Sequence, residues 1–371
     1  MKEIAVICYT EGGKQTGREL IAGLRTLGRN PRGYQFRQED EEFQQFLDGK
    51  QLAEDCFRER RAMIFVCAAG IAVRMISPFV TSKQTDPAVL VIDERGHFVI
   101  PLLSGHLGGA NELAKQCRDI LHIREDGFLS TAVITTATDL HGMPAIDELS
   151  RIMGWRLSDL SLVKKVSAEV LKGKPLILQM DDHFTDSYIE KVKNEVLAWN
   201  AQVEFTDDPN HRPLGNNTVL FTYAAVSGDG KESVLRVIPQ IFTLGIGCKR
   251  GTTKEAVQGE LKTFFERFQI DIRAVKKACS IDLKKDEPGI VEALGEAKIP
   301  FQTYGAEQLS ELDGDFSDSE FVKKTTGVGN VCERSAVAGC DGKGIVCIPK
   351  YANHGITIAL AVEEGTMKQQ E

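Results

Sequence analysis

The chain has 371 residues, enough for two or three domains that each bury their own core. Of these residues, 42% are hydrophobic and 26% are charged, which is typical of globular proteins and excludes a disordered or fibrous chain. The formal net charge of −8 argues against a general binder of nucleic acid or of acidic membranes. An anionic substrate would have to be bound by local Lys and Arg side chains and backbone N–H groups, because the overall charge of the protein repels it.

The cysteines and the apolar runs exclude further classes. None of the nine cysteines forms a C-x-x-C pair, so we expect small core residues and no metal site built by the protein. The longest apolar run, residues 64–73, is much shorter than the ~20 residues of a membrane span. The chain begins with the strand-like MKEIAVICY and not with a signal peptide, so we expect a cytoplasmic protein.

Residues 1–146 alternate between strand and helix patterns. Buried strands are predicted at 4–8, 31–36, 63–67 and 132–135, and helices at 20–27, 39–61, 71–75 and from 111 onward. A turn signal at 93–96 between two apolar runs predicts a hairpin. We therefore expect an α/β fold whose N-terminal domain is doubly wound. Sites in such sheets lie at the carboxyl ends of strands, which are followed here by the loops 69–74, 104–111 and 135–139.

One of these loops is rich in glycine and carries Ser104, Gly105, His106, Gly108, Gly109 and Asn111. A strand that turns on glycines into a helix N-terminus presents N–H groups and a partial positive charge, which favour an anion. His106 can act there as a general acid or base, and its alternative role is a hydrogen bond that stabilises the turn.

Residues 147–239 form a less regular central module. Strands are predicted at 176–180, 203–205, 219–222 and 234–238, and a surface loop at 207–217. The module contains no catalytic motif that we recognise. We expect a small α/β connector with a mainly structural role.

The C-terminal domain, residues 240–371, begins with a second strand that enters a glycine turn. Gly247, Lys249 and Arg250 follow this strand, and Thr252 with Glu255 predicts a capping box that opens a helix. Two cations inside the turn favour an anion, although the motifs of a P-loop and of a dinucleotide fold are both missing. Further strands are predicted at 273–280, 300–303, 345–348 and 356–360, helices at 286–297 and from 319 and 330, and a frayed tail at 363–371.

The remaining candidate residues each have a structural alternative. Arg74, Lys285 and Arg334 are either charge partners of an anion or solvated surface cations. Glu333 is either a base or a carboxylate that stabilises a helix terminus. We expect His97 and His354 to be structural.

Segments at both ends of the chain resemble the CbiG family of cobalamin biosynthesis. The N-terminal domain of that family is matched by GIAVR (70–74), DPAVLVIDE (86–94), IPLLSGHLGGANELA (100–114) and ITTATD (134–139). Its C-terminal domain is matched by LGIGCKRGT (244–252), TGVGNVCERSA (326–336) and the pair Lys285 and Glu287.

The resemblance implies a cobalt-precorrin-5A hydrolase, a hydrolase that acts on a carbon–carbon bond. Such an enzyme opens the ring-A δ-lactone and releases C20 with its methyl group as acetaldehyde, which leaves cobalt-precorrin-5B. The substrate is a cobalt corrinoid rich in carboxylates, so the cobalt enters with the substrate and no cofactor is expected. The expected partners are this corrinoid, a second copy of the chain in a homodimer and, transiently, other enzymes of the corrin pathway.

We expect His106 or Glu333 to act as the base when water attacks the lactone, with loop N–H groups stabilising the oxyanion. The two glycine loops are expected to face this ligand together. Two other functions are a non-catalytic carrier of tetrapyrroles and a nucleotide-binding transferase. The expected substrate-binding residues are Gly70, Arg74, Ser104, Gly105, Gly108, Gly109, Asn111, Thr136, Asp139, Gly247, Lys249, Arg250, Lys285, Glu287, Thr326, Gly327 and Arg334.

Overall fold

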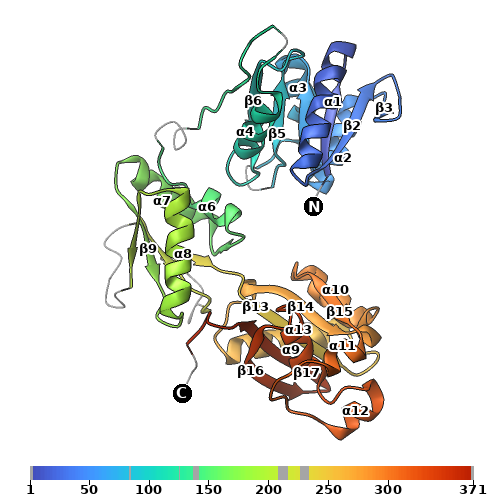
Figure 1. Cartoon of the computed structure of the whole chain (residues 1–371), viewed down its shortest axis with the longest axis vertical. Helices are drawn as coiled ribbons and strands as arrows, with labels where there is room; N and C mark the ends of the chain where they lie inside the picture. Colours follow the sequence, from blue (N-terminus) through green and yellow to red (C-terminus); the bar gives the residue numbers. More distant parts are fainter. Residues whose placement is uncertain are drawn as a thin grey trace. The chain divides into compact units, whose positions relative to one another are not determined.

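The computed structural model describes residues 3–82, 85–124, 126–136, 142–207, 216–225 and 234–368 (Figure 1). The chain divides into two compact units, Met1–Arg151 and Ile152–Glu371. The first unit holds one sheet and the second holds two, and strands that pair in parallel dominate the fold. The predicted α/β class is confirmed. None of the helices in the described ranges is long and apolar enough to cross a membrane.

The sheet of the first unit has seven strands in the order β3-β2-β1-β4-β5-β6-β7. Strands β1 to β5 run parallel, β6 runs antiparallel to β5, and β7 runs parallel to β6. The strands are β1 (Glu3–Cys8), β2 (Asn30–Phe36), β3 (Phe43–Phe46), β4 (Ala62–Val66), β5 (Val89–Ile92), β6 (Phe98–Leu103) and β7 (Thr131–Ala132). The helices are α1 (Glu11–Thr26), α2 (Gly49–Glu59), α3 (Ala69–Ile76), α4 (Ala110–Leu121) and α6 (Ile146–Ile152).

Both faces of this sheet are covered by helices. Alternate residues of a strand point to opposite faces, so Ile4 and Val6 of β1 pack with α1 and α4, whereas Ala5 and Ile7 pack with α2 and α3. The apolar run of β1 is therefore buried on both sides. The doubly wound arrangement that the sequence predicts is confirmed, as is the hairpin of β5 and β6.

The predicted helix at 39–61 is wrong in extent. Its first part is strand β3, in which Phe43 and Phe46 are buried and which pairs with β2. Helix α2 begins only at Gly49, where Asp48 caps it by accepting from the backbone N of Lys50 and Gln51. The error arises because a short strand is followed almost directly by a helix. The apolar residues of the two elements together have the spacing of one long amphipathic helix.

The central part of the chain forms a five-stranded sheet in the order β10-β9-β11-β12-β8. The four predicted strands are confirmed, and β8 adds a short antiparallel strand beside β12. Two helices that the sequence pattern did not indicate, α7 and α8, accompany the sheet. The elements are β8 (Arg156–Leu157), α7 (Leu160–Leu171), β9 (Leu176–Met180), α8 (Asp186–Trp199), β10 (Val203–Thr206), β11 (Thr218–Phe221) and β12 (Leu235–Ile238).

The third sheet has the order β15-β14-β13-β17-β16. Strands β13, β14 and β15 run parallel, β17 runs antiparallel to β13, and β16 runs antiparallel to β17. The carboxyl ends of three strands therefore meet the β16–β17 turn at one edge. The elements are β13 (Phe242–Cys248), α9 (Lys254–Arg267), β14 (Val275–Ile281), α10 (Pro288–Glu296), β15 (Phe301–Tyr304), α11 (Ala306–Ser310), α12 (Glu320–Thr326), α13 (Val331–Ala338), β16 (Gly344–Asn353) and β17 (Ile356–Glu363).

The described part of the tail is held in place. The backbone N of Lys368 donates to the carbonyl of His183 at 3.0 Å, and Met367 forms a β-bridge with Phe184. The hydroxyl of Thr185 donates to the carbonyl of Gly365. The predicted fraying is wrong up to residue 368, because these long-range bonds satisfy the terminal backbone.

Candidate functional site

The three loops that follow strands of the first sheet lie at two opposite edges. Strand β4 runs parallel to β1 and β5, so the loop 69–74 lies at their carboxyl edge. The β5–β6 hairpin reverses the chain, so the loop 104–111 and Thr136, which follow β6 and β7, lie at the other edge. At ~3.3 Å per residue, five strand residues separate the two edges by about 16 Å. Each loop follows the carboxyl end of a strand, as predicted for the loops at 69–74 and 104–111, but the three do not share one edge of the sheet.

The glycine loop at 104–111 satisfies much of its own backbone. The N–H of Ala110 donates to the carbonyl of Ser104, that of Asn111 to Gly105 and that of Gly109 to His106, at 3.0 to 3.1 Å. Gly109 adopts φ +80°. The sequence suggested that these N–H groups bind an anion. They already donate to carbonyls of the loop, so they are not available to an anion in this conformation.

His106 lies against helix α6. Its Nδ1 is 3.8 Å from Oδ1 of Asp147, and the side chains of the two residues are 11% and 10% exposed. The backbone carbonyl of His106 accepts from Nε of Arg151 at 3.0 Å. The structure thus assembles a histidine–carboxylate pair with a nearby guanidinium. The sequence pattern of the loop could not identify Asp147 and Arg151 as neighbours of His106, because both lie far along the chain, Arg151 at a separation of 45 positions.

The other N-terminal candidates are dispersed. Nδ2 of Asn111 donates to Oγ1 of Thr136 at 3.0 Å, so these two lie together near the glycine loop. Gly70 and Arg74 lie on α3 at the opposite edge, where Nη1 of Arg74 donates to the carbonyl of Gly70 at 3.1 Å. Asp139 lies outside the described residues.

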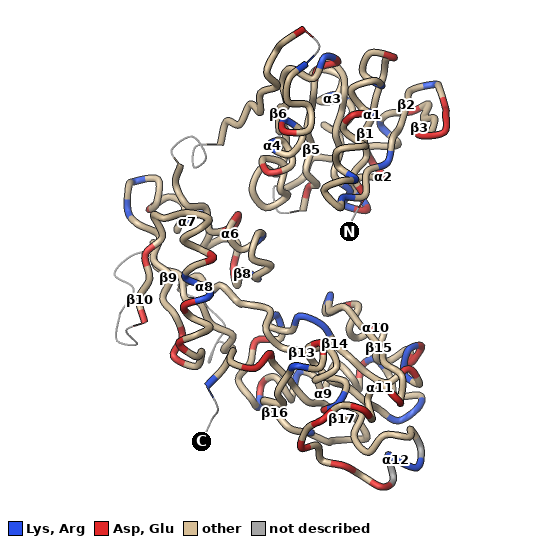
Figure 2. The backbone as a smooth tube through the Cα atoms, viewed as in Figure 1, with Lys and Arg blue, Asp and Glu red and all other residues tan. Residues whose placement is uncertain are grey.

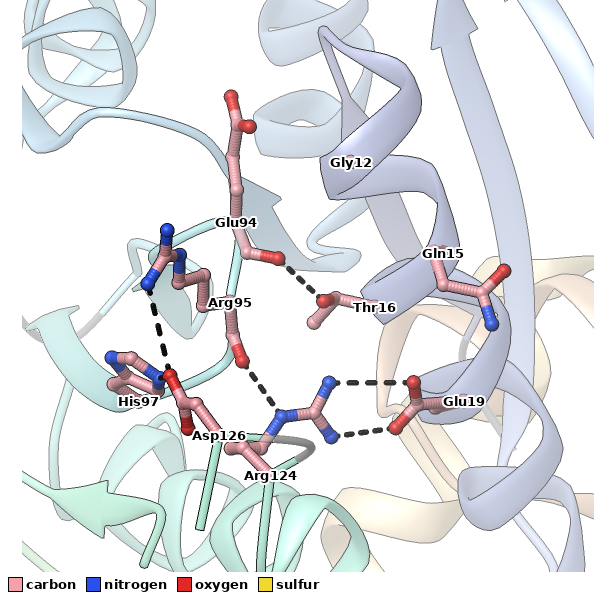
Figure 3. Close-up of a pocket in the computed structure, with 9 residues that line it drawn as sticks. All are labelled: Gly12, Gln15, Thr16, Glu19, Glu94, Arg95, His97, Arg124 and Asp126. Carbon is pink, nitrogen blue, oxygen red and sulfur yellow. Dashed lines mark hydrogen bonds and ion pairs between the residues drawn. The ribbon is translucent and has the colours of Figure 1, made fainter. Parts of the chain in front are cut away.

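The first unit also contains a pocket of about 560 Å³ that the sequence pattern did not indicate (Figure 3). Arg124 lies 2.6 Å from the carboxylate of Glu19, and Nε2 of His97 lies 2.7 Å from that of Asp126. His97 also stacks on Phe128 with ring centroids 4.3 Å apart. These charges are paired within the protein, so the pocket is a weak candidate for an anion and His97 has structural partners.

Three loops meet at the carboxyl edge of the third sheet. They are residues 249–253 after β13, residues 282–287 after β14 and residues 327–330 before α13. The backbone N of Gly251 in the first loop donates to Oε1 of Glu287 in the second at 2.8 Å. Val328 of the third loop packs in one apolar cluster with Ile281, the last residue of β14. In Figure 2, Asp and Glu residues mark the loop between α11 and α12, and Lys residues mark α12 itself.

Glu287 occupies the glycine turn that the sequence suggested for a substrate anion. The residue is 7% exposed, and Oε2 lies 2.8 Å from Nζ of Lys284. The hydrogen bond from Lys284, followed by that from Gly251, holds the pKa of Glu287 below its usual value despite burial. Glu287 is thus a ligand of the turn. The exposed cations at this edge are Lys249, Arg250 and Lys285.

The predicted capping box of Thr252 and Glu255 is wrong, because α9 is capped by Thr253 and the residue three positions further on is Ala256, whose side chain cannot complete a box. Oγ1 of Thr253 caps α9 by accepting from the backbone N of Ala256, whereas the hydroxyl of Thr252 donates to the carbonyl of Lys249. Gly247 lies within β13 and pairs with Thr357 of β17. Gly247 is therefore part of the sheet and not of the turn.

Glu333 is 1% exposed and is saturated with hydrogen bonds. Its carboxylate accepts from the backbone N of Ser317 at 2.8 Å and of Lys350 at 2.7 Å, from Nδ2 of Asn330 at 2.7 Å and from Oγ of Ser317 at 3.1 Å. A carboxylate in this setting joins three chain segments and leaves little room for water. The geometry favours the structural alternative for Glu333.

The neighbours of Glu333 also have structural partners. Arg334 donates to the carbonyls of Leu309 and Leu312 and lies 4.3 Å from the ring centroid of Phe316. Gly327 ends α12 with φ +81°, and the hydroxyl of Thr326 donates to the carbonyl of Val328 at 3.0 Å. Arg334 therefore anchors the loop before α12 and is not an exposed substrate cation.

The fold and these loops define an α/β protein with exposed cations at the carboxyl edge of its C-terminal sheet, an arrangement suited to small anionic molecules. Residues 51–139 match the family model described as Cobalamin synthesis G N-terminal, and residues 242–361 match Cobalamin synthesis G C-terminus. The chain belongs to the cobalamin synthesis G family, CbiG.

Similar proteins span nearly the full length of the chain. Cobalt-precorrin-5A hydrolase of Salmonella typhimurium is 33% identical over 363 residues, which are 97% of this chain and 98% of the relative. The protein of the same name from Priestia megaterium is 28% identical and covers 97% of this chain and 95% of its own. A crystal structure of a cobalamin biosynthesis protein G homolog from Sulfolobus solfataricus is 20% identical, covers 98% of this chain and 97% of its own, and has a TM-score of 0.38.

Proposed function

We propose that this protein is a cobalt-precorrin-5A hydrolase of cobalamin biosynthesis. The observation that carries the proposal is the similarity of 97% of the chain, at 33% identity, to a protein of that name. Both family models match in the expected order, so the similarity extends over the N-terminal and C-terminal sheets.

The cations at the carboxyl edge of the third sheet suit such a substrate. A corrinoid intermediate carries acetate and propionate groups, and Lys249, Arg250 and Lys285 are exposed there. Because nearby N–H groups bond to protein oxygens, these side chains supply the charge-assisted contacts. Cobalt enters as part of the substrate.

In the first chemical step, water attacks the carbonyl of the ring-A lactone. We assign its deprotonation to His106, whose imidazole lies beside the Asp147 carboxylate. The tetrahedral intermediate then collapses with cleavage of the ester C–O bond, and the imidazolium protonates the leaving alkoxide. The product is a carboxylate with a hydroxyl on C20, which is the starting point for loss of acetaldehyde.

The direct test is to incubate the purified protein with cobalt-precorrin-5A and to trap aldehyde. We expect acetaldehyde in an amount equal to the corrinoid consumed, over many turnovers. A tight corrinoid complex without aldehyde would contradict the proposal and support the carrier. A rise in melting temperature with ATP, NAD or S-adenosylmethionine would instead support a transferase, and we expect none.

Removing two of the exposed cations should weaken substrate binding. We expect the Lys249→Ala and Arg250→Ala double variant to raise KM at least tenfold, since each charge-assisted contact contributes about 1.5–3 kcal/mol when formed. The change in kcat should be small, because these contacts hold the substrate in all states. Steady-state kinetics check this, with Lys262→Ala on the exposed surface of α9 as the control. An unchanged KM would contradict the assignment of these cations.

A further inference from the structure

The turn between β16 and β17 places a histidine where the backbone favours glycine or asparagine. His354 and Gly355 join the strands with φ of +46° and +78°. A two-residue hairpin loop with positive φ at both positions is characteristic of a type I′ turn, in which Asn-Gly is preferred. Histidine is tolerated at this position, because Asn, Asp and His are the residues enriched at positive φ. The contacts of its side chain are what distinguish it from asparagine.

The imidazole of His354 is paired with a buried carboxylate. Its Nδ1 lies 2.7 Å from Oε1 of Glu260 on α9, and the two side chains are 78% and 10% exposed. The same carboxylate accepts from Nδ2 of Asn353 at 3.1 Å and from the hydroxyl of Tyr351 at 3.4 Å. The hydrogen bond from His354 is the main cause that lowers the pKa of Glu260, so the carboxylate stays ionised. Because Nδ1 faces Glu260, Nε2 faces solvent.

The turn that carries His354 lies against Lys249, one of the cations proposed to hold the substrate. The last residue of β13, Cys248, pairs with Ile356 at the start of β17. The next residue, Lys249, donates its backbone N–H to the carbonyl of Gly355 at 3.0 Å. Its side chain follows the turn, since a Cβ on Gly355 would lie 2.9 Å from Cδ of Lys249. Glu260 from α9 is thus the charged group that bonds to the imidazole, and Lys249 from the loop after β13 runs along the next residue of the turn.

We propose that His354 carries the proton in the carbon–carbon cleavage step, with Glu260 as its positioning residue. The inference rests on the proposed function. After the lactone has opened, Nε2 takes the proton of the C20 hydroxyl. The electrons of that O–H bond form the C=O bond of acetaldehyde, and the electrons of the C20–ring bond pass to the macrocycle. The imidazolium then returns the proton to the ring carbon, so the step needs no other reactant.

The structure meets the two requirements of this step. A group that accepts a proton and later returns it needs an accessible nitrogen and an anion that stabilises the imidazolium in between. Nε2 of His354 and the carboxylate of Glu260 provide both. His106 is assigned to the earlier opening of the lactone, so the two histidines should fail at different steps.

The decisive variant is His354→Asn. Asparagine suits the left-handed turn and can still bond to Glu260, but it cannot carry a proton at neutral pH, so the melting temperature should stay the same or rise. We expect acetaldehyde release to slow by about 10²-fold. The corrinoid that accumulates should have the mass of the substrate plus one water. The control is His183→Asn, which alters another exposed histidine paired with an aspartate, Asp181, and should leave turnover unchanged.

Glu260→Gln tests the positioning role. The amide keeps an oxygen for Asn353 and Tyr351 but removes the negative charge that stabilises the imidazolium. We expect the acidic limb of the pH–rate profile to move to lower pH, which a purely structural role of Glu260 would not cause.

Two results would overturn the inference. One is normal acetaldehyde release by a folded His354→Asn protein, and the other is accumulation of the unopened lactone by that protein. If the wild-type protein itself releases no acetaldehyde from cobalt-precorrin-5A, the proposed function fails instead.

Discussion

Replacing His106 by Gln is expected to lower kcat for acetaldehyde release by about 10²-fold or more, because a positioned general base contributes 10²–10⁴-fold. The substrate should remain as the unopened lactone, since the base acts when water attacks. KM should change little, because the imidazole is assigned to proton transfer and not to binding. Steady-state kinetics with mass analysis of the corrinoid provide the measurement.

The same variant distinguishes the catalytic role from a role in stabilising the turn. The hydrogen bonds of the loop to Gly109 and Arg151 use the carbonyl of His106 and not its imidazole, so the substitution leaves them in place. The melting temperature should therefore change by only a few degrees. His97→Gln, another histidine paired with an aspartate in this unit, is the control and should keep normal activity. A large loss of stability with normal kcat would support the turn role.

Replacing Glu333 by Ala is expected to lower the free energy of unfolding by about 3 kcal/mol or more, since each buried donor left without an acceptor costs about 1–3 kcal/mol. The donors that lose their acceptor are the backbone N–H groups of Ser317 and Lys350 and the amide of Asn330. At ~2–4 °C per kcal/mol for a unit of this size, the melting temperature should fall by roughly 6–12 °C. Thermal unfolding followed by circular dichroism checks this.

The matched control is Glu292→Ala on the exposed face of α10, which should change the unfolding free energy by less than about 0.5 kcal/mol. Activity of the Glu333→Ala protein should persist at a temperature where it is fully folded. Loss of activity there without loss of stability would restore Glu333 as a base.

Local sequence patterns determined the elements and the fold class. The buried run of β1 and the turn signal at 93–96 act over a few neighbouring positions, so they can be recognised from the sequence alone. The same locality explains the error at residues 39–61, where a strand and a helix follow each other so closely that their periods merge.

Tertiary structure decided which partners the candidate residues have. The sequence indicated glycine turns suited to anions, but the turn after β13 is occupied by Glu287, 36 positions away, and the carboxylate of Glu333 is shared with Lys350. The β5–β6 hairpin was predicted, but its effect of sending two loops to the opposite edge appears only once the strands pair. The partner of His354 is also distant in the sequence, because α9 brings Glu260 to its Nδ1. These contacts depend on which segments, distant in the sequence, become neighbours in the fold. The packing of whole sheets and helices determines those neighbours, whereas local residue spacing determines only where each helix and strand lies in the sequence.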